Sequence, residues 1–481
     1  MATSIGLLAQ ELSNGNPWWR GTQWVVRDPD LSEVAQAPLS YESDCLDNLE
    51  PGNLYILRGP RRVGKTVAVK QTIRRLLNDG VRSTRIIRVA VDGWDAKALR
   101  TLVGNSTLPV LREGETRFWF LDEVSAVSGD WAQQLKWLRD NDEQFRRDTV
   151  VLTGSNARAL TEAGGVLAGR RGRGTHLDRI LLPMGFRTFA TTILRGDVPP
   201  GGHLAAAALR THEAKERYED SIPWLDGLTR AWEQYLLYGG FPRSVSALLD
   251  GQPVPESFVD DLFDAVSADV FKNSQLPAVT EMALLERLWK SIATPANVTS
   301  IGEDVGISNQ VVTRHVEYLR DAFLLWACPQ RHDTRWLPKP KSQSKLYAID
   351  PLVARLPHLR NSARPDLDPT VLTEMQIGMA VRRRVLVDKY TDRGSWRSKA
   401  ATVNASEWDG ILVTKNVLDI AYTDTAWAVP AGILAYFLDV SPPPPEGIHK
   451  PFGTTRRGPP TARGRASSLL WLAFCRSLRA R

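Results

Sequence analysis

The sequence predicts an α/β protein built on a doubly wound parallel sheet, and three observations support this prediction. Residues 54–77 read as an apolar strand, a glycine-containing loop and an amphipathic helix. Residues 118–123 are an apolar run that ends in two acids, which is typical of a buried parallel strand. Strand and helix patterns alternate as far as residue 182, as expected for a sheet with helices on both faces.

The loop after the first predicted strand matches G-x-x-x-x-G-K-[ST] at every required position. Backbone N–H groups of such a loop surround a polyphosphate, and the following helix directs the positive end of its dipole at the same anion. Lys65 would reach the β- and γ-phosphates of ATP, and the Thr66 hydroxyl would ligate Mg²⁺. The predicted nucleotide-binding residues are Gly59, Pro60, Arg61, Arg62, Val63, Gly64, Lys65 and Thr66.

The second half of this site is expected where the apolar run 118–121 ends. Asp122 would support the metal, and Glu123 would orient and polarise the attacking water. The alternative is a strand that ends in an ordinary polar loop. The phosphate-binding motif upstream favours the catalytic interpretation.

Two further catalytic candidates follow. Ser155, after the apolar strand 149–152, would sense the γ-phosphate, with Asn156 as second choice; either residue could instead N-cap the next helix. Arg170, in a loop of arginines and glycines, would act as an arginine finger, in cis or from a neighbouring subunit. A solvated loop is the alternative for Arg170.

Composition and charge limit the other options. At 481 residues the chain should contain several domains, and no apolar run is long enough for a transmembrane helix. The N-terminus lacks the features of a signal peptide, and three distant cysteines fit a reducing cytoplasm. Residues 446–481 hold eight Lys or Arg and one acid, which accounts for the whole net charge of +7. The net positive charge therefore does not predict a nucleic-acid or other acidic partner for the folded domains.

Outside the core, residues 1–50 form a lead segment in which Trp18, Trp19 and Trp24 should anchor the chain to the core; stacking on a base is the alternative. A helix is expected over residues 95–111. Residues 196–275 read as a helical lid in which one helix ends at paired glycines, within 238–242.

Residues 276–350 read as a winged helix-turn-helix, with helices near 284–292, 301–306 and 309–325. DNA contact is one role for such a unit, and a lid or docking module of an ATPase is the other. The expected buried stripe is Val312, Val316, Leu319 and Phe323. The side chains expected to face outward are Asn309, Gln310, Thr313, Arg314 and Glu317, with Lys339, Lys341 and Lys345 on the wing.

The chain carries a series of motifs whose order along the sequence resembles that of prokaryotic AAA-superfamily ATP-binding proteins. These are archaeal-type or STAND-like P-loop ATPases with a C-terminal domain of unknown function. The resemblance spans about residues 16–440. It implies a P-loop NTPase core, a lid, a winged helix and a C-terminal α/β domain. The motifs are NPWW (16–19), GPRRVGKT (59–66), FLDE (120–123), LTGS (152–155), LAGR (167–170), LLPMGFRTF (181–189), YGGFP (238–242) and KLYAIDP (345–351).

In that family the C-terminal domain resembles a restriction-endonuclease fold. The matching acids here are Glu374, Asp409 and Asp419, but Ala421 stands where the catalytic lysine is expected, with Lys415 as a weak substitute. The domain is therefore expected to be inactive as a nuclease, although its acids could still bind a metal or serve only as turn and strand-edge residues. The basic tail 446–481 does not match the family and is expected to be disordered.

The sequence thus predicts a cytoplasmic, Mg²⁺-dependent ATPase with ATP as its ligand, a homo-oligomer as one option and no membrane partner. A slowly hydrolysing nucleotide switch is the first alternative, and a DNA-binding protein with a degenerate nuclease domain is the second. The expected domains are 1–50 (lead), 51–195 (ATPase core), 196–275 (lid), 276–350 (winged helix), 351–445 (nuclease-like) and 446–481 (tail).

Overall fold

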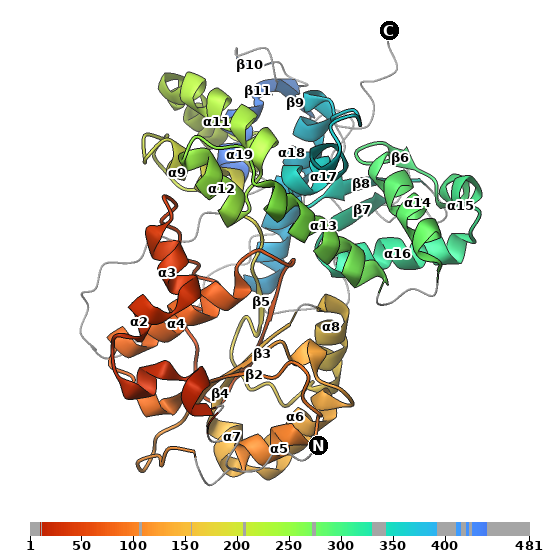
Figure 1. Cartoon of the computed structure of the whole chain (residues 1–481). Coiled ribbons are helices and arrows are strands. Elements are labelled where there is room, and N and C mark those ends of the chain that lie inside the picture. Colours follow the sequence, from red (N-terminus) through yellow and green to blue (C-terminus); the bar gives the residue numbers. More distant parts are fainter. Residues whose placement is uncertain are drawn as a thin grey trace, which may run out of the picture.

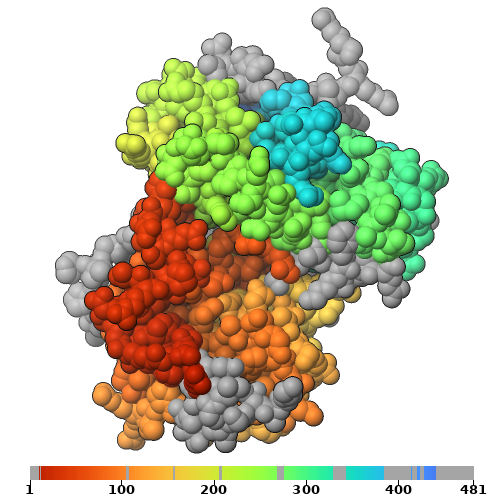
Figure 2. All heavy atoms as spheres, viewed as in Figure 1, coloured from red at the N-terminus to blue at the C-terminus, as the bar shows by residue number. Residues whose placement is uncertain are grey.

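The computed structural model describes residues 10, 12–104, 108–154, 156–204, 208–271, 276–329, 343–391, 410–414, 420–422 and 426–439. A lower half holds a five-stranded sheet, and the upper half is mostly helical (Figure 1). The N-terminal segment, in red, covers one flank of the lower half (Figure 2). In this part of the chain no helix is both long and apolar enough to cross a bilayer.

The sheet of the lower half is parallel throughout and has the order β2-β3-β4-β1-β5. Every residue of β1, β3 and β4 is buried, as expected for strands covered on both faces. Tyr55 and Leu57 enter one hydrophobic core, whereas Leu54 and Ile56 enter the other. The strands are β1 (Leu54–Arg58), β2 (Ile86–Ala90), β3 (Phe118–Asp122), β4 (Thr149–Thr153) and β5 (Asp178–Ile180).

Helices cover both faces of this sheet, so the doubly wound arrangement is confirmed. The lead segment and α4 share a core with one face, through residues such as Trp24 and Val69. The helices α5 to α8 share a core with the other face, through residues such as Leu135 and Leu160. The helices of this half are η1 (Pro17–Arg20), α2 (Trp24–Arg27), α3 (Pro29–Gln36), α4 (Lys65–Asn78), η2 (Ser83–Arg85), α5 (Ala98–Val103), η3 (Val124–Ala126), α6 (Trp131–Asn141), α7 (Glu143–Arg147) and α8 (Ala157–Val166).

The helix expected over 95–111 is much shorter, because α5 covers only Ala98–Val103. Before it, the Ala96 N–H donates to the Ser128 carbonyl at 2.9 Å, which holds the chain in a loop. After it, the Gly104 N–H closes the last turn on the Arg100 carbonyl at 3.0 Å. The predicted extent was therefore wrong at both ends.

The lead segment covers the free edge of β2, one of the two outer strands of the sheet. The indole N–H groups of Trp18 and Trp19 both donate to the Ile86 carbonyl at 3.0 Å. The Asn16 amide pairs with the backbone of Arg88 in both directions, accepting from its N–H at 2.6 Å and donating to its carbonyl at 2.9 Å. Unpaired strand edges invite association with other chains. Anchoring of this segment by tryptophan is confirmed.

The upper half begins after β5. The helix α9 packs on α11 and α19 of this half. The helix α11 ends at Tyr238, where Gly239 has a φ of +65°, and Pro242 begins α12, as the paired glycines predict. The remaining elements are α9 (Phe186–Ile193), α10 (His212–Asp220), η5 (Ile222–Trp224), α11 (Leu225–Tyr238), α12 (Pro242–Leu249), α13 (Glu256–Phe271), α17 (Pro351–Arg360), α18 (Pro369–Thr391), β9 (Gly410–Thr414), β10 (Ala421–Tyr422), β11 (Ala426–Pro430) and α19 (Ala431–Leu438).

The described residues of the module 278–348, which are 278–329 and 343–348, form three helices and a three-stranded antiparallel sheet with the order β6-β8-β7. The predicted buried stripe of the third helix was partly wrong. His315 is buried in it, whereas Phe323 lies beyond the helix end, half-buried, with a φ of +57°. The elements are α14 (Ala278–Trp289), β6 (Pro295–Ala296), α15 (Val298–Val305), α16 (Asn309–Asp321), β7 (Leu325–Pro329) and β8 (Ser344–Ala348).

Three of the motifs, LLPMGFRTF, YGGFP and KLYAIDP, meet at one buried junction of the upper half, just after the chain leaves β5. Both N–H and carbonyl groups take part: Met184 N–H donates to the Gly240 carbonyl at 2.7 Å, and Gly240 N–H donates to Asp350 at 2.8 Å. A Cβ on Gly240 would lie 1.9 Å from the Met184 carbonyl oxygen, so only glycine fits there. Arg383 donates to the Pro183 carbonyl at 2.6 Å. The junction therefore fixes where the chain leaves the core.

Replacing Asp350 with asparagine should lower the free energy of unfolding by about 2–4 kcal/mol at neutral pH. The side-chain NH₂ group of the asparagine would face the N–H of either Gly240 or Leu352. In the wild type the carboxylate accepts a hydrogen bond from each of these two N–H groups. Burial raises the pKa of Asp350 to about 6. The Asp350 carboxyl therefore takes up a proton more readily in the folded than in the unfolded state. This preference contributes to the free energy of unfolding at low pH, and the contribution is lost as the pH rises through about 6.

The advantage of the wild type over D350N should therefore shrink by about 1 kcal/mol between about pH 5 and about pH 7.5. Urea unfolding of both proteins at the two pH values measures this difference, and groups common to both proteins cancel. An advantage that grows with pH would contradict the assignment.

Candidate nucleotide site

The loop after β1 has the backbone that phosphate binding requires. A Cβ on Gly59 would lie 2.0 Å from the carbonyl oxygen of Leu181, so the loop approaches the chain after β5 too closely for any side chain. Gly64 has a φ of +97° and immediately precedes α4. Arg62 also has a positive φ, +63°. The loop thus curls over the start of α4, where N–H groups and the helix dipole favour an anion.

Lys65 is the first residue of α4, and its side chain is almost fully buried. Its ammonium group donates to the carbonyl oxygens of Gly59 and Pro60, both at 2.9 Å. The charge therefore lies across the loop, within the same turn whose N–H groups would surround a phosphate. Thr66 follows in the first turn of the helix and is half-buried.

Asp122 lies at the same edge of the sheet as this loop, because β1 and β3 are both parallel neighbours of β4 and end alongside it. The two strands do not touch; β4 separates them, which corresponds to about 10 Å. Thr153, the last residue of β4, bridges part of this distance by donating its hydroxyl to the Asp122 carboxylate. From the motifs alone we expect these two strand ends to be immediate neighbours; that expectation is wrong, because β4 lies between them.

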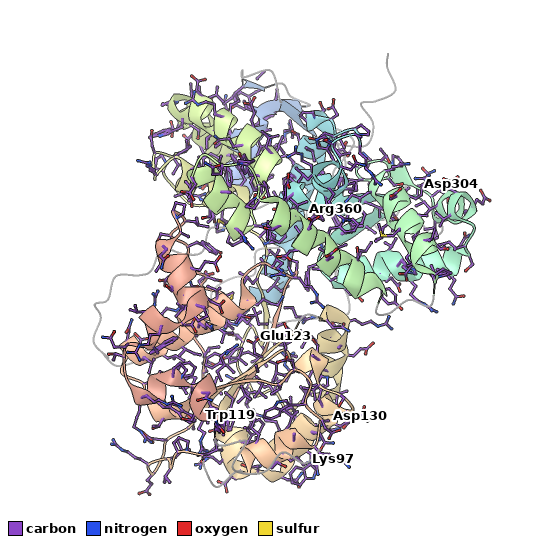
Figure 3. All side chains as sticks on the ribbon, viewed as in Figure 1. Lys97, Trp119, Glu123, Asp130, Asp304 and Arg360 are labelled. Atoms are coloured by element: carbon purple, nitrogen blue, oxygen red, sulfur yellow. The ribbon has the colours of Figure 1, made fainter. Side chains whose placement is uncertain are left out.

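Glu123 follows β3 in a left-handed conformation, with a φ of +59°. Its N–H donates to the Thr153 hydroxyl at 3.3 Å, and its side chain is half-buried. Figure 3 shows Glu123 at the side of the core that faces the upper half, whereas Trp119, a residue of β3, lies lower in the view and farther from the upper half. A non-glycine residue with a positive φ is uncommon and marks a constrained position.

Sequence reasoning missed a cation beside Asp122. Arg88, from the edge strand β2, donates to the second carboxylate oxygen at 2.6 Å. The exposed fraction is 17% for the Arg88 side chain and 5% for that of Asp122, so this ion pair is largely shielded from water. One signal was available, since a charged residue in the middle of an apolar strand needs a partner.

Ser155 lies outside the described residues. The alternative role is confirmed for Asn156, which N-caps α8: its side chain accepts from the Ala159 N–H at 3.0 Å. Its own N–H donates to the Ser125 hydroxyl at 3.1 Å. Gly154 lies at the same edge of the sheet as Asp122, because it follows β4.

Arg170 lies at the opposite edge of the sheet. Its carbonyl accepts from Arg139 at 3.0 Å, and the next carbonyl, that of Arg171, accepts from the N–H of Leu54, the first residue of β1. Its guanidinium pairs with Asp140 at 3.1 Å. The phosphate loop follows the other end of β1, about 15 Å away. The structure therefore contradicts an arginine finger acting within its own chain.

The phosphate loop also contacts the upper half directly. Arg62 pairs with Asp261 of α13 at 3.3 Å. Both side chains are well exposed, 50% and 41%, so the pair contributes only about 0–1 kcal/mol and is easily exchanged. This link, together with the contact between Gly59 and the chain after β5, connects the loop to the upper half of the molecule.

The candidate nucleic-acid residues Asn309, Gln310, Thr313 and Arg314 are all exposed on α16. Of the wing lysines, Lys339 and Lys341 lie outside the described residues. Lys345 points elsewhere: it pairs with Glu374 of α18, which also accepts from the Tyr347 hydroxyl at 3.1 Å. The expectation that Lys345 extends a DNA-binding wing was therefore wrong.

The nuclease-like site cannot be assembled from the described residues, because Asp409, Asp419 and Lys415 all lie outside them. In those described ranges, no three His, Cys, Asp or Glu side chains gather as a metal-ligand group. Mg²⁺ at a nucleotide usually takes only one or two protein ligands, with phosphate oxygens and waters completing its shell. The Thr66 hydroxyl and Asp122 carboxylate, both oxygen donors, fit that requirement.

Two family models match parts of the chain. Residues 51–190 match an AAA domain family, and residues 229–361 match a domain of unknown function. No curated protein gives a significant match.

Solved structures of low identity are also similar to the chain. A Walker-type ATPase of Pyrococcus abyssi is 15% identical, covering 64% of this chain and 91% of its own with a TM-score of 0.35. The Aeropyrum pernix ORC2 protein, in ADPNP–ADP complexes, is 14% identical, covering 70% and 90% with a TM-score of 0.33. The Thermotoga maritima RuvB Holliday junction branch migration motor is 14% identical, covering 61% and 84% with a TM-score of 0.25.

The five-stranded parallel sheet with helices on both faces has the α/β fold of P-loop NTPases, and over residues 51–190 the chain matches the AAA domain family.

Proposed function

We propose that the protein binds ATP at the loop 59–66 and hydrolyses it with Mg²⁺, and that the nucleotide state moves the lid helices and the module 278–348. The observation that carries this proposal is the shared edge of the sheet, where the loop bearing Lys65 and the acid Asp122 both lie. The match of residues 51–190 to an AAA domain supports it.

Each residue has a distinct task in this proposal. The Lys65 ammonium exchanges its two backbone carbonyl acceptors for the β- and γ-phosphate oxygens. Glu123 accepts a proton from the attacking water and orients it, and its constrained backbone holds the carboxylate in place. Ser155, two residues after the end of β4 in the sequence, is proposed to contact the γ-phosphate. Arg170 is proposed to act only as an arginine finger for the nucleotide site of a neighbouring copy in a homo-oligomer.

Thr66 and Asp122 are the residues that would hold Mg²⁺. The bound ion neutralises negative charge on the phosphates during transfer. The Thr153 hydroxyl already orients the Asp122 carboxylate, so this side chain does not have to reorient when the nucleotide binds.

The module 278–348 is proposed to be a winged helix that acts as a lid or docking unit. Its helix α16 lies beside α8 of the core, where the Arg158 guanidinium stands 5.5 Å from the centre of the Tyr318 ring. DNA binding through Asn309, Gln310, Thr313 and Arg314 is the alternative. The C-terminal domain is proposed to be inactive as a nuclease, because Ala421 replaces the expected lysine.

Single-turnover hydrolysis of radiolabelled ATP, with ADP release followed separately, tests the proposed ATPase. An enzyme should release ADP at least about once per minute, whereas a nucleotide switch should retain ADP for longer. Lack of any Mg²⁺-dependent hydrolysis, with ATP still bound, would exclude the ATPase and favour the switch. Fluorescence anisotropy with duplex DNA, comparing wild type and Arg314→Ala, decides the DNA alternative.

A further inference from the structure

The ion pair between Arg88 and Asp122 lies inside the proposed metal site, and the two residues share one face of the sheet. Asp122 follows Phe118 and Phe120 in alternation, and Arg88 follows Ile86; these three apolar residues all enter the core on the α4 side. The guanidinium thus reaches the carboxylate from the face on which the phosphate-binding helix packs.

The position of Arg88 is fixed by more than this one contact. Asn16 is fully buried and holds both backbone groups of Arg88, and its amide also donates to the Leu12 carbonyl at 2.8 Å. On the other side of the carboxylate, the Thr153 hydroxyl occupies the remaining oxygen. Both oxygens of Asp122 therefore have a protein donor, and the one supplied by Arg88 carries a full positive charge.

We propose that Arg88 is a positioning residue that stands in for the divalent cation at Asp122 and is exchanged for Mg²⁺ when the metal–nucleotide complex binds. The inference rests on the proposed nucleotide site. A guanidinium and a divalent cation cannot both neutralise one carboxylate at close range without repelling each other. Arg88 thereby keeps the acid from repelling an incoming triphosphate, and it raises the Mg²⁺ concentration at which the metal-bound state forms.

The test measures equilibrium binding of a fluorescent ATP analogue, in EDTA and across a Mg²⁺ titration, so that turnover is not the readout. The variants are Arg88→Gln and Arg88→Met, which remove the charge and keep much of the side-chain length. The matched control is Arg85→Gln; this arginine precedes the same strand and donates to the Thr116 carbonyl at 2.7 Å, away from Asp122.

The expected result is a pair of opposite changes. In EDTA the Arg88 variants should bind the analogue about fivefold or more weakly, because the uncompensated carboxylate repels the triphosphate. In the titration their half-saturating Mg²⁺ concentration should fall about 5- to 30-fold. Arg85→Gln should match the wild type in both. A purely structural role for Arg88 would weaken binding in both conditions.

An unchanged or higher half-saturating Mg²⁺ concentration in folded Arg88 variants would overturn the inference while leaving the proposed function intact. If the wild type itself fails to bind the analogue, the proposed function fails instead. Should both variants lose the fold by circular dichroism, Arg88→Lys decides: its single donor group should still lower the Mg²⁺ requirement by about threefold, and an unchanged requirement would overturn the inference.

Discussion

Replacing Glu123 with glutamine should slow the turnover of ATP by about 100-fold or more. The dissociation constant of ATP should stay within about threefold of the wild-type value, since the interaction is lost mainly in the transition state. Glutamine keeps the size of the side chain but cannot accept the proton of the attacking water. Steady-state hydrolysis and equilibrium binding, measured on the same preparation, give the two quantities.

The control for this variant is Glu113→Gln, because Glu113 is an exposed acid of the same half of the molecule. Its hydrolysis rate should equal that of the wild type. If Glu123→Gln hydrolyses ATP at the wild-type rate, Glu123 is not the residue that prepares the water, and the catalytic assignment at the end of β3 is wrong.

Replacing Lys65 with alanine should abolish nucleotide binding, with a loss of affinity of about 100-fold or more. The ammonium is nearly buried and carries the only charge that contacts the carbonyls of Gly59 and Pro60 among the hydrogen bonds described here. Its removal takes away the charge-assisted contacts with two phosphates. Isothermal titration with ATP and Mg²⁺ measures the loss.

Lys97→Ala is the matched control, since Lys97 is exposed on the lower half at a distance from Glu123 (Figure 3). Its affinity should not change. Circular dichroism checks that Lys65→Ala keeps its fold. Retention of wild-type affinity in folded Lys65→Ala protein would show that the loop 59–66 is not where the nucleotide binds.

The core, and the position of the glycine-containing loop and Asp122 at one edge of the sheet, could be predicted because their signals are local. A five-residue apolar strand, a loop with glycines at fixed spacing and a helix start lie within one short segment, and sterics decide its shape. The end of β3 is equally local. Parallel strands then bring both ends to the same edge of the sheet.

The position of Arg170 follows from the topology of parallel sheets, not from its local sequence. In an α/β sheet, loops after strands lie at the carboxyl edge, whereas loops after helices return to the amino edge. Gly154 follows β4 and so belongs to the first class, and Ser155 is the next residue in the sequence. Arg170 follows α8 and belongs to the second, which places it beside Leu54 and Asp140.

The other differences depend on contacts between distant segments. An arginine inside β2 indicates that a partner is needed, but nothing local says that the partner is Asp122. The backbone clamp by Asn16 joins residues 72 positions apart. His315, which was not expected in the buried stripe of α16, is buried there, and its Nδ1 atom lies 2.8 Å from the Val311 carbonyl oxygen. A hydrogen bond of this kind cannot be predicted from the hydrophobicity pattern.

A structure of the protein with Mg²⁺ and a non-hydrolysable ATP analogue tests the central claim most directly. The account predicts the triphosphate against the backbone N–H groups of the loop (residue 59 and residues 61–66), Lys65 within hydrogen-bonding distance of its phosphates, and the metal between Thr66 and Asp122. A nucleotide bound elsewhere, or a metal whose nearest protein oxygens belong to neither Thr66 nor Asp122, would contradict it.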